Sequence, residues 1–263
     1  MSSDTVAPTA PAHRPGVVGP AASRRDRARA RTLAEIKAAA RAELVAHGPG
    51  GIQLRAVARQ VGLTAPALYR YYPGLDELVQ DLTADLMWEL VGRMEAARDA
   101  EPTGNPFTRM LVVAREFRRW AVSHPPEFGL VFASPPATWG TQERTPCQEA
   151  GDQFGNVFAT LFLQMWRAAP FSVPEVDHLA PGLEPTLAPY WTWLTHELAP
   201  GIPMGAVVRF LEGWVRIYGS VALETFGHLQ WSMSDGEPLF EQTLMGLAEL
   251  VGRPDGYLPP ARP

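Results

Sequence analysis

The chain has 263 residues, 46% of them hydrophobic and 19% charged, which is enough for one large domain or for a small domain joined to a larger one. Its single cysteine, Cys147, excludes an intrachain disulfide and a cysteine-rich metal site. No run of about eighteen uncharged apolar residues occurs, so a membrane-spanning helix is excluded and a soluble, cytoplasmic protein is expected.

The net charge of −5 conceals a strong asymmetry between the two ends of the chain. Up to residue 75 there are eleven basic and four acidic residues, a net charge of +7, whereas the remainder has twelve basic and twenty-four acidic residues, a net charge of −12. A basic head on an acidic body is the pattern expected when one end of a protein meets a polyanion such as DNA.

Residues 1–23 contain four prolines and almost no large apolar side chains, a composition typical of a disordered segment. A cluster of arginines follows: Arg24, Arg25, Arg27, Arg29 and Arg31. These arginines are either the solvated start of a helix or a flexible arm that lies along DNA phosphates. We expect residues 1–30 to form a disordered basic arm, with Arg29 and Arg31 contacting DNA.

The rest of the chain has apolar residues at helical spacing, interrupted by proline and glycine clusters, and no alternating strand pattern. The predicted helices outside the motif described below are residues 32–47, 75–100, 106–124, a short one to 133, 145–169, 186–198, 203–229 and 239–251, with a loop at 134–144. The fold class is therefore all-α. A three-helix head of residues 31–75 is joined by a long fourth helix to a larger helical body of residues 76–253, followed by a tail at 254–263.

The segment from Leu54 to Tyr72 has the pattern of two short helices that cross at a tight turn. Ala58 is the small residue at the crossing, Gly62 permits a positive φ in the turn, and Thr64 stands at the N-cap of the second helix. Apolar residues fall where the angle between the helices must be filled: Val57, Val61, Leu63, Leu68 and Tyr71 or Tyr72. An ordinary helical hairpin is the alternative, but the combined pattern and its basic surroundings favour a DNA-reading helix-turn-helix.

The stretch from Gly62 to Leu78 resembles the TetR family of bacterial transcriptional regulators. The family pattern is Gly, an apolar residue, Ser or Thr, a short variable stretch and Leu-Tyr-x-x-Phe, then a turn and an acidic residue that opens the fourth helix. The resemblance is close over about residues 31–80. Two positions depart from it: Tyr72 replaces the usual Phe, and Leu75 replaces a Lys that often contacts a phosphate.

The resemblance implies DNA contacts within the motif. The residues that would face the major groove are Ala65, Pro66, Tyr69 and Arg70. The residues that would lie at the phosphates are Thr64 and Tyr71. By their chemistry, Arg70 suits a guanine edge, whereas Ala65 and Pro66 can only touch a thymine methyl. Tyr69 either donates to a phosphate or only packs. Gln53 and Arg55, at the start of the first motif helix, are placed for backbone contact.

Helix-turn-helix proteins usually bind inverted repeats as two-fold dimers, and the family resemblance implies pairing through the last two helices. Glycines in a helix interior cost about 1 kcal/mol each, so their recurrence in residues 203–229 indicates close helix approach. The predicted dimer interface consists of Phe210, Trp214, Ile217, Val221 and Leu247. The segment Trp214–Gly219 also resembles a C-terminal subgroup marked by Trp, then His and Gly, with Tyr218 in place of the His. The alternative is that residues 203–229 form a buried central helix, which does not exclude a role in the dimer.

The middle helices are rich in aromatic residues and methionine. Most of these are expected to be core, although eight tryptophans exceed what packing requires. The family resemblance implies an effector cavity among helices four to eight, for which we expect a small apolar or aromatic molecule. The predicted pocket residues are Trp88, Met110, Phe117, Trp120, Phe128, Phe162 and Trp166. No polar anchor can be chosen among His124, His178, His196 and Glu197.

The function indicated is a ligand-responsive repressor that binds an operator as a homodimer. Ligand would shift the fourth helix, which is expected to pack on the head through Leu75, Leu78 and Leu82. An alternative is a small-molecule-binding helical dimer with weak or lost DNA binding, suggested by Leu75 and the acidic body. An enzyme is not expected, because no catalytic triad, phosphate loop, paired-histidine metal spacing or dinucleotide fingerprint is found. No cofactor or metal is expected either.

Overall fold

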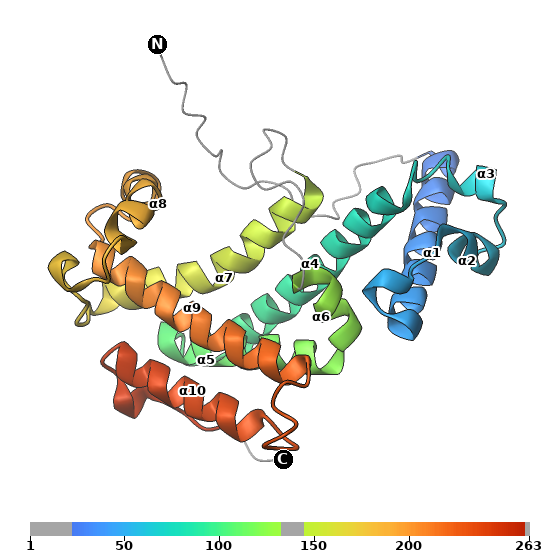
Figure 1. Ribbon diagram of the computed structural model, residues 1–263. Helices are drawn as coiled ribbons and strands as arrows, with labels where there is room; N and C mark the ends of the chain where they lie inside the picture. The colour runs from blue at the N-terminus through green and yellow to red at the C-terminus, as the bar shows by residue number, and fades with distance from the viewer. Residues whose placement is uncertain (1–22, 133–144, 261–263) are drawn as a thin grey trace, which may run out of the picture.

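The computed structural model describes residues 23–132 and 145–260, which form ten α-helices and three short 3-10 turns without any strand (Figure 1). The all-α prediction is confirmed. Residues 1–22, predicted to be disordered, and the predicted loop 134–144 lie outside the described residues. Within the described ranges, no helix combines the length and the apolar character needed to cross a membrane.

The head consists of α1 (Arg24–His47), α2 (Leu54–Gln60) and α3 (Ala65–Leu68). Helix α1 starts at Arg24 because Ser23 and Asp26 form a capping box, in which each side chain accepts a hydrogen bond from the other's backbone N–H at 3.1 Å. The prediction of a disordered arm is therefore wrong for residues 24–30, which form the first turns of α1.

The body is built on α4 (Leu75–Ala100), α5 (Pro106–Ser123) and α7 (Pro146–Ala168), which pack against one another, with the short α6 (Pro125–Phe132) beside them. An aromatic cluster fills the body around Phe117, whose ring contacts those of Phe128, Phe132, Phe154, Phe158 and Trp214. This cluster accounts for much of the aromatic content of the middle helices, which therefore serves packing.

Helices α8 (Leu183–Glu197), α9 (Met204–Thr225) and α10 (Glu237–Leu250) complete the body. Helix α8 starts before the predicted residue 186, with Pro185 in its first turn, where a missing N–H costs no helical hydrogen bond. Helix α9 ends at Thr225 rather than 229, because the backbone leaves the helix through Phe226 and turns at Gly227 with φ +73°. In Figure 1, α9 and α10 lie along one side of the body, and α8 stands at the end far from the head.

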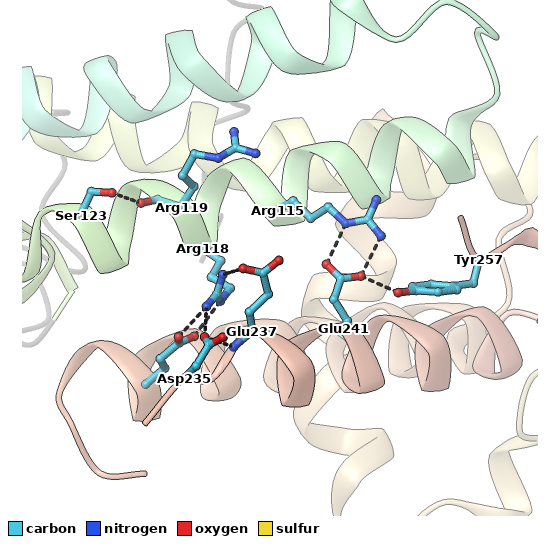
Figure 2. Close-up of polar contacts among 9 residues, drawn as sticks. Arg115, Arg118, Arg119, Ser123, Asp235, Glu237, Glu241 and Tyr257 are labelled. Atoms are coloured by element: carbon cyan, nitrogen blue, oxygen red, sulfur yellow. Dashed lines mark hydrogen bonds and ion pairs between the residues drawn. The ribbon is translucent and has the colours of Figure 1, made fainter. Parts of the chain in front are cut away.

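Two arginines of α5 hold α9 and α10 against the body (Figure 2). Arg115 donates to both carboxylate oxygens of Glu241 at 2.8 and 2.7 Å, and the Tyr257 hydroxyl donates to the same carboxylate. Arg118 donates to both oxygens of Glu224 at 2.7 and 2.6 Å. Because all four paired side chains are at most 14% exposed, these bidentate pairs set the position of the α9–α10 hairpin on α5.

Candidate nucleic-acid interface

The turn between α2 and α3 has the geometry that the helix-turn-helix pattern requires. Gly62 adopts φ +69°, a conformation in which other L-residues are strained. The Leu63 N–H donates to Ala58 O at 2.9 Å, and the Thr64 side chain accepts a hydrogen bond from the Ala67 N–H at the start of α3. Val57 and Leu68 are buried between the helices, so α3 is held at a fixed angle to α2.

The predicted major-groove residues share one accessible surface. Pro66, Tyr69 and Arg70 are exposed, and Ala65 is half-buried at the first position of α3. Tyr69 is 53% exposed, which is unusual for a large aromatic side chain and leaves its hydroxyl available to a ligand. Backbone hydrogen bonds continue the helical turn through Arg70.

The predicted phosphate-contact residues border this surface. Thr64, Gln53 and Arg55 are exposed, and Arg55 lies in the first turn of α2. Tyr71 is half-buried, so it packs inside the head as well as bordering the surface.

The start of α1 lies beside α3. The Arg29 guanidinium lies over the Tyr71 ring, 5.2 Å from its centroid. Arg31 is exposed and pairs with Glu35 one turn along the helix, at 2.9 Å. The helical start of α1 thus adds basic residues next to the predicted DNA-contact surface, with Arg29 held on the motif.

A polar cluster that the sequence did not reveal fixes the motif on α4. The buried Tyr72 hydroxyl donates to Asp81 Oδ2 at 2.5 Å, and Lys37 of α1 pairs with Asp81 at 3.4 Å and Asp85 at 2.5 Å. Burial, with the hydrogen bond to Asp81, raises the pKa of Tyr72 well above its ordinary value and keeps the hydroxyl a donor. The substitution of Tyr for the family's usual Phe therefore adds a link between head and body.

A second network joins α1 to the body. Arg41 donates to Glu89 of α4 at 2.6 Å and to Glu127 of α6 at 3.1 Å, while Trp120 Nε1 donates to Glu89 at 3.0 Å. Burial alone would raise the pKa of Glu89, but the hydrogen bonds from Arg41 and Trp120 outweigh it and leave that pKa below its ordinary value. Four helices thus meet at one cluster of charges between head and body.

Comparisons with known proteins agree with this geometry. The family described as bacterial regulatory proteins, tetR family, matches residues 36–82, and the tetracyclin repressor-like C-terminal domain matches residues 110–247. The chain belongs to the TetR family. It is a transcriptional regulator with a helix-turn-helix DNA-binding domain, as the resemblance implied.

Two relatives are 30% identical over 208 residues, covering 78% of this chain and 84% of theirs: the HTH-type transcriptional regulators Rv1816 of Mycobacterium tuberculosis and Mb1846 of Mycobacterium bovis. The crystal structure of regulatory protein SCO4313 is 25% identical, with a TM-score of 0.65 over 86% of this chain and all of the other. A TetR-family transcription regulator from Shewanella sp. PV-4 shares the fold, with 13% identity and a TM-score of 0.51 over 81% of this chain and 96% of its own.

Several residues predicted to line an effector pocket of this TetR-family body belong to its packed core. Phe117, Trp120 and Phe128 are completely buried. Phe117 and Phe128 belong to the aromatic cluster, and Trp120 donates to Glu89 in the junction between head and body. Their side chains are enclosed by packing and do not line the cavity that the structure contains, so a role for them in effector binding stays a prediction.

The other predicted pocket residues divide into two pairs. Met110 and Phe162 line a small cavity among α5, α7, α9 and α10. Trp88 packs half-buried against the core, and Trp166 lies edge-on against Phe171, so neither lines that cavity. The cavity lies deeper toward the last two helices than the resemblance implied.

Three of the five residues predicted to form the dimer interface face inward. Ile217, Val221 and Leu247 are buried within the single chain, where a partner cannot bury them further. Phe210 and Trp214 are half-buried and line the cavity. Helix α9 thus uses its larger apolar face to pack on its own body, which leaves Ile217, Val221 and Leu247 little surface for a partner, and an interface through Phe210 and Trp214 stays a prediction.

The opposite face of α9 has apolar residues that the sequence analysis missed. Val215 is 66% exposed and Leu223 is 44% exposed, and both lie on one face with Gly219 at intervals of four residues. A Cβ added at Gly219 would meet no atom within 4 Å. Met245, on α10, is also an exposed apolar residue. Hydrophobicity alone does not distinguish these residues from the buried apolar residues of α9. Only their exposure in the folded chain identifies the stripe.

Proposed function

We propose that this TetR-family regulator is a ligand-responsive repressor that binds an inverted-repeat operator as a homodimer. The observation that carries the proposal is the exposed reading face of α3, where Arg70 and Tyr69 stand free while Leu68 and Tyr72 anchor the same turn. An exposed Arg beside an exposed aromatic residue provides a bidentate donor for guanine and a hydroxyl for a phosphate.

The body supports a two-site mechanism. Helix α4 packs on the head through the buried Leu78 and Leu82, and it also packs along α5 and α7, which form two walls of the cavity. Leu75, by contrast, is partly exposed at the start of the helix. A ligand that widens the cavity displaces α5 or α7 and thereby changes the angle of the head. Operator affinity then falls by the difference in ligand affinity between the two forms.

The exposed stripe of Val215, Gly219 and Leu223 supports a dimer through α9. A row of apolar residues with a glycine between them lets a second helix approach closely. Two heads on one two-fold axis would then meet two half-sites on the same side of the DNA.

The test is binding of the full chain to the DNA upstream of its own gene, measured by fluorescence anisotropy with and without an effector. The proposal predicts salt-dependent, sequence-specific binding of two chains that weakens when effector is added. Unchanged operator affinity at saturating effector would contradict the regulatory part of the proposal.

A second candidate is a small-molecule-binding dimer with weak or lost DNA binding. It is favoured by the start of α4, where Leu75 is followed by the exposed acidic residues Asp76 and Glu77. These carboxylates stabilise the helix N-terminus but do not attract phosphates. Failure to bind any DNA more tightly than a random sequence would favour this candidate.

A further inference from the structure

A cavity of about 50 Å³ lies where α5, α7, α9 and α10 meet. Its walls are mostly apolar and include Met110, Phe162, Gly213 and Leu247. Arg209 of α9 is the one charged residue among the described residues that line it. Ligand sites combine apolar walls with a few polar groups that orient the ligand, so Arg209 determines which ligand this cavity accepts.

The guanidinium of Arg209 is only partly satisfied. Its Nη1 donates to Glu212 Oε2 at 2.8 Å, so the positive charge already has a partner on the same helix. Its Nε is buried and has no hydrogen-bond partner among the described residues. A buried N–H without an acceptor costs free energy, and an acceptor that arrives with a ligand removes this cost.

We infer that the cavity binds a small neutral molecule with a hydrocarbon ring or chain and one carbonyl oxygen that accepts the hydrogen bond from Arg209 Nε. The inference rests on the proposed function, since it names the chemical class of the effector. A neutral acceptor fits better than a carboxylate, because Glu212 already balances the charge of Arg209. A second anion would stand near Glu212 in apolar surroundings.

The size of the cavity limits the hydrocarbon part. An apolar cavity of about 150 Å³ holds benzene, so this smaller space fits a five-carbon ring only when its walls adjust. Met110 and Met165 line the cavity, and their unbranched side chains can make that adjustment.

Three ring compounds test the chemistry by calorimetric titration of the whole 263-residue chain. They are cyclopentanone, methylenecyclopentane, in which carbon replaces the carbonyl oxygen, and cyclopentanecarboxylate. The ratio of ketone to alkene affinity should be at least about tenfold higher in the wild type than in Arg209→Met, because only the wild type donates to the oxygen. Arg216→Met, at an exposed position of the same helix, should leave this ratio unchanged.

Three results would overturn the inference. The first is an equal ratio in the wild type and in Arg209→Met. The second is tighter binding of the carboxylate than of the ketone, which would make the site an anion site. The third is the absence of ketone binding to the wild-type protein.

Substitution of Gly213 tests the location. A Cβ added there would lie 3.5 Å from Leu247 Cδ2, an ordinary contact, and because Gly213 lines the cavity a larger side chain should take up space within it. Gly213→Leu should abolish binding of both neutral probes, and Gly213→Ala should weaken it while retaining the fold. Undiminished binding to both variants would place the ligand elsewhere and contradict the assignment.

Operator affinity measured in the presence of each probe separates this inference from the proposed function. Ketone binding with unchanged operator affinity would keep the cavity as a ligand site and contradict its regulatory use. A different compound that releases DNA, with no ketone bound here, would overturn the cavity assignment and leave the proposed regulation standing.

Discussion

Arg70 and Tyr72 lie two residues apart, yet one faces solvent and the other is buried against α4. Side chains at this spacing point to nearly opposite sides of a helical turn. The same turn can therefore present a guanidinium to a base edge and anchor itself to the body through a phenol. The two positions predict different phenotypes.

The Arg70→Ala substitution removes the side chain best suited to reading guanine. It should weaken specific binding by about 1–3 kcal/mol and relax the preference at one base position in each half-site. Anisotropy titrations over a set of singly substituted operators measure both effects, with Arg119→Ala on α5 as the control. An equal loss on every sequence would show that Arg70 contacts a phosphate instead.

The Tyr72→Phe substitution restores the family's usual residue and removes the hydrogen bond to Asp81. Asp81 keeps Lys37 as a partner and is partly exposed, so the expected loss in the free energy of unfolding is about 1 kcal/mol. Urea denaturation followed by circular dichroism measures it. Stability equal to or above that of the wild type would show that this hydrogen bond contributes nothing net.

At the scale of the element, α1 combines two functions along its length. Its middle packs on the motif and its Lys37 and Arg41 pair with the body, whereas its first turns bear exposed arginines. One rigid helix therefore connects the junction with the surface that is predicted to face DNA.

The arginines at the start of α1 are expected to contact phosphates. Replacing Arg24, Arg25 and Arg29 by Gln should reduce the slope of log affinity against log salt by about 0.9 for each phosphate that is no longer neutralised. Arg119→Gln, which removes one exposed charge from the body, shows how far the slope depends on an arginine away from the start of α1. An unchanged slope would mean that the start of α1 does not reach DNA.

The junction of α1, α4, α5 and α6 predicts a pH dependence. Because the pKa of Glu89 is below its ordinary value in the fold, its ionised form stabilises the protein above that ordinary value of about 4.3. This stability is lost as the pH falls through the lowered pKa. The difference in unfolding free energy between the wild type and Glu89→Gln should be constant above about pH 5 and shrink below about pH 4.

Denaturation series at several pH values measure this difference, with Glu197→Gln at an exposed site of α8 as the control. Carboxylates titrate within the range of about pH 3 to 7. A difference in unfolding free energy that stays constant over this range would contradict the role assigned to Glu89.

The bounds of the helices could be predicted from the sequence better than the contacts between them. The bounds of α4 agree with the prediction, because flanking prolines and glycines stop a helix locally. The start of α1 was missed even though Ser23 and Asp26 have capping-box spacing, since the arginine run was read as an arm. The Arg41–Glu127 pair joins residues 86 positions apart, and nothing local indicates it.

The same contrast between local features and contacts made by distant residues holds for the candidate sites. The helix-turn-helix geometry and the exposed surface of α3 were predicted, because the motif is local and its turn chemistry is specific. The burial of the apolar side chains was not predicted residue by residue, because helical periodicity places Phe117 or Ile217 on an apolar face but does not tell which helix covers it. Core, cavity wall and dimer surface all require large apolar side chains.

For the whole molecule, the stripe on α9 predicts the oligomeric state. Val215→Glu combined with Leu223→Glu places two charges on the proposed interface and should convert a dimer to a monomer. Sedimentation velocity measures the change, with Val122→Glu at another exposed apolar position as the control. A wild-type monomer, or a double variant that stays dimeric, would contradict the interface.

The most direct measurement of the central claim is selection of DNA by the whole 263-residue chain from random duplexes, followed by sequencing. If α3 reads DNA within a two-fold dimer, the selected sequences will contain two inverted half-sites about 10 base pairs apart, centre to centre, or a multiple of that spacing. Arg70→Ala should lose one symmetric base from this pattern. Selection that enriches no sequence, or only a single half-site without symmetry, would contradict the account.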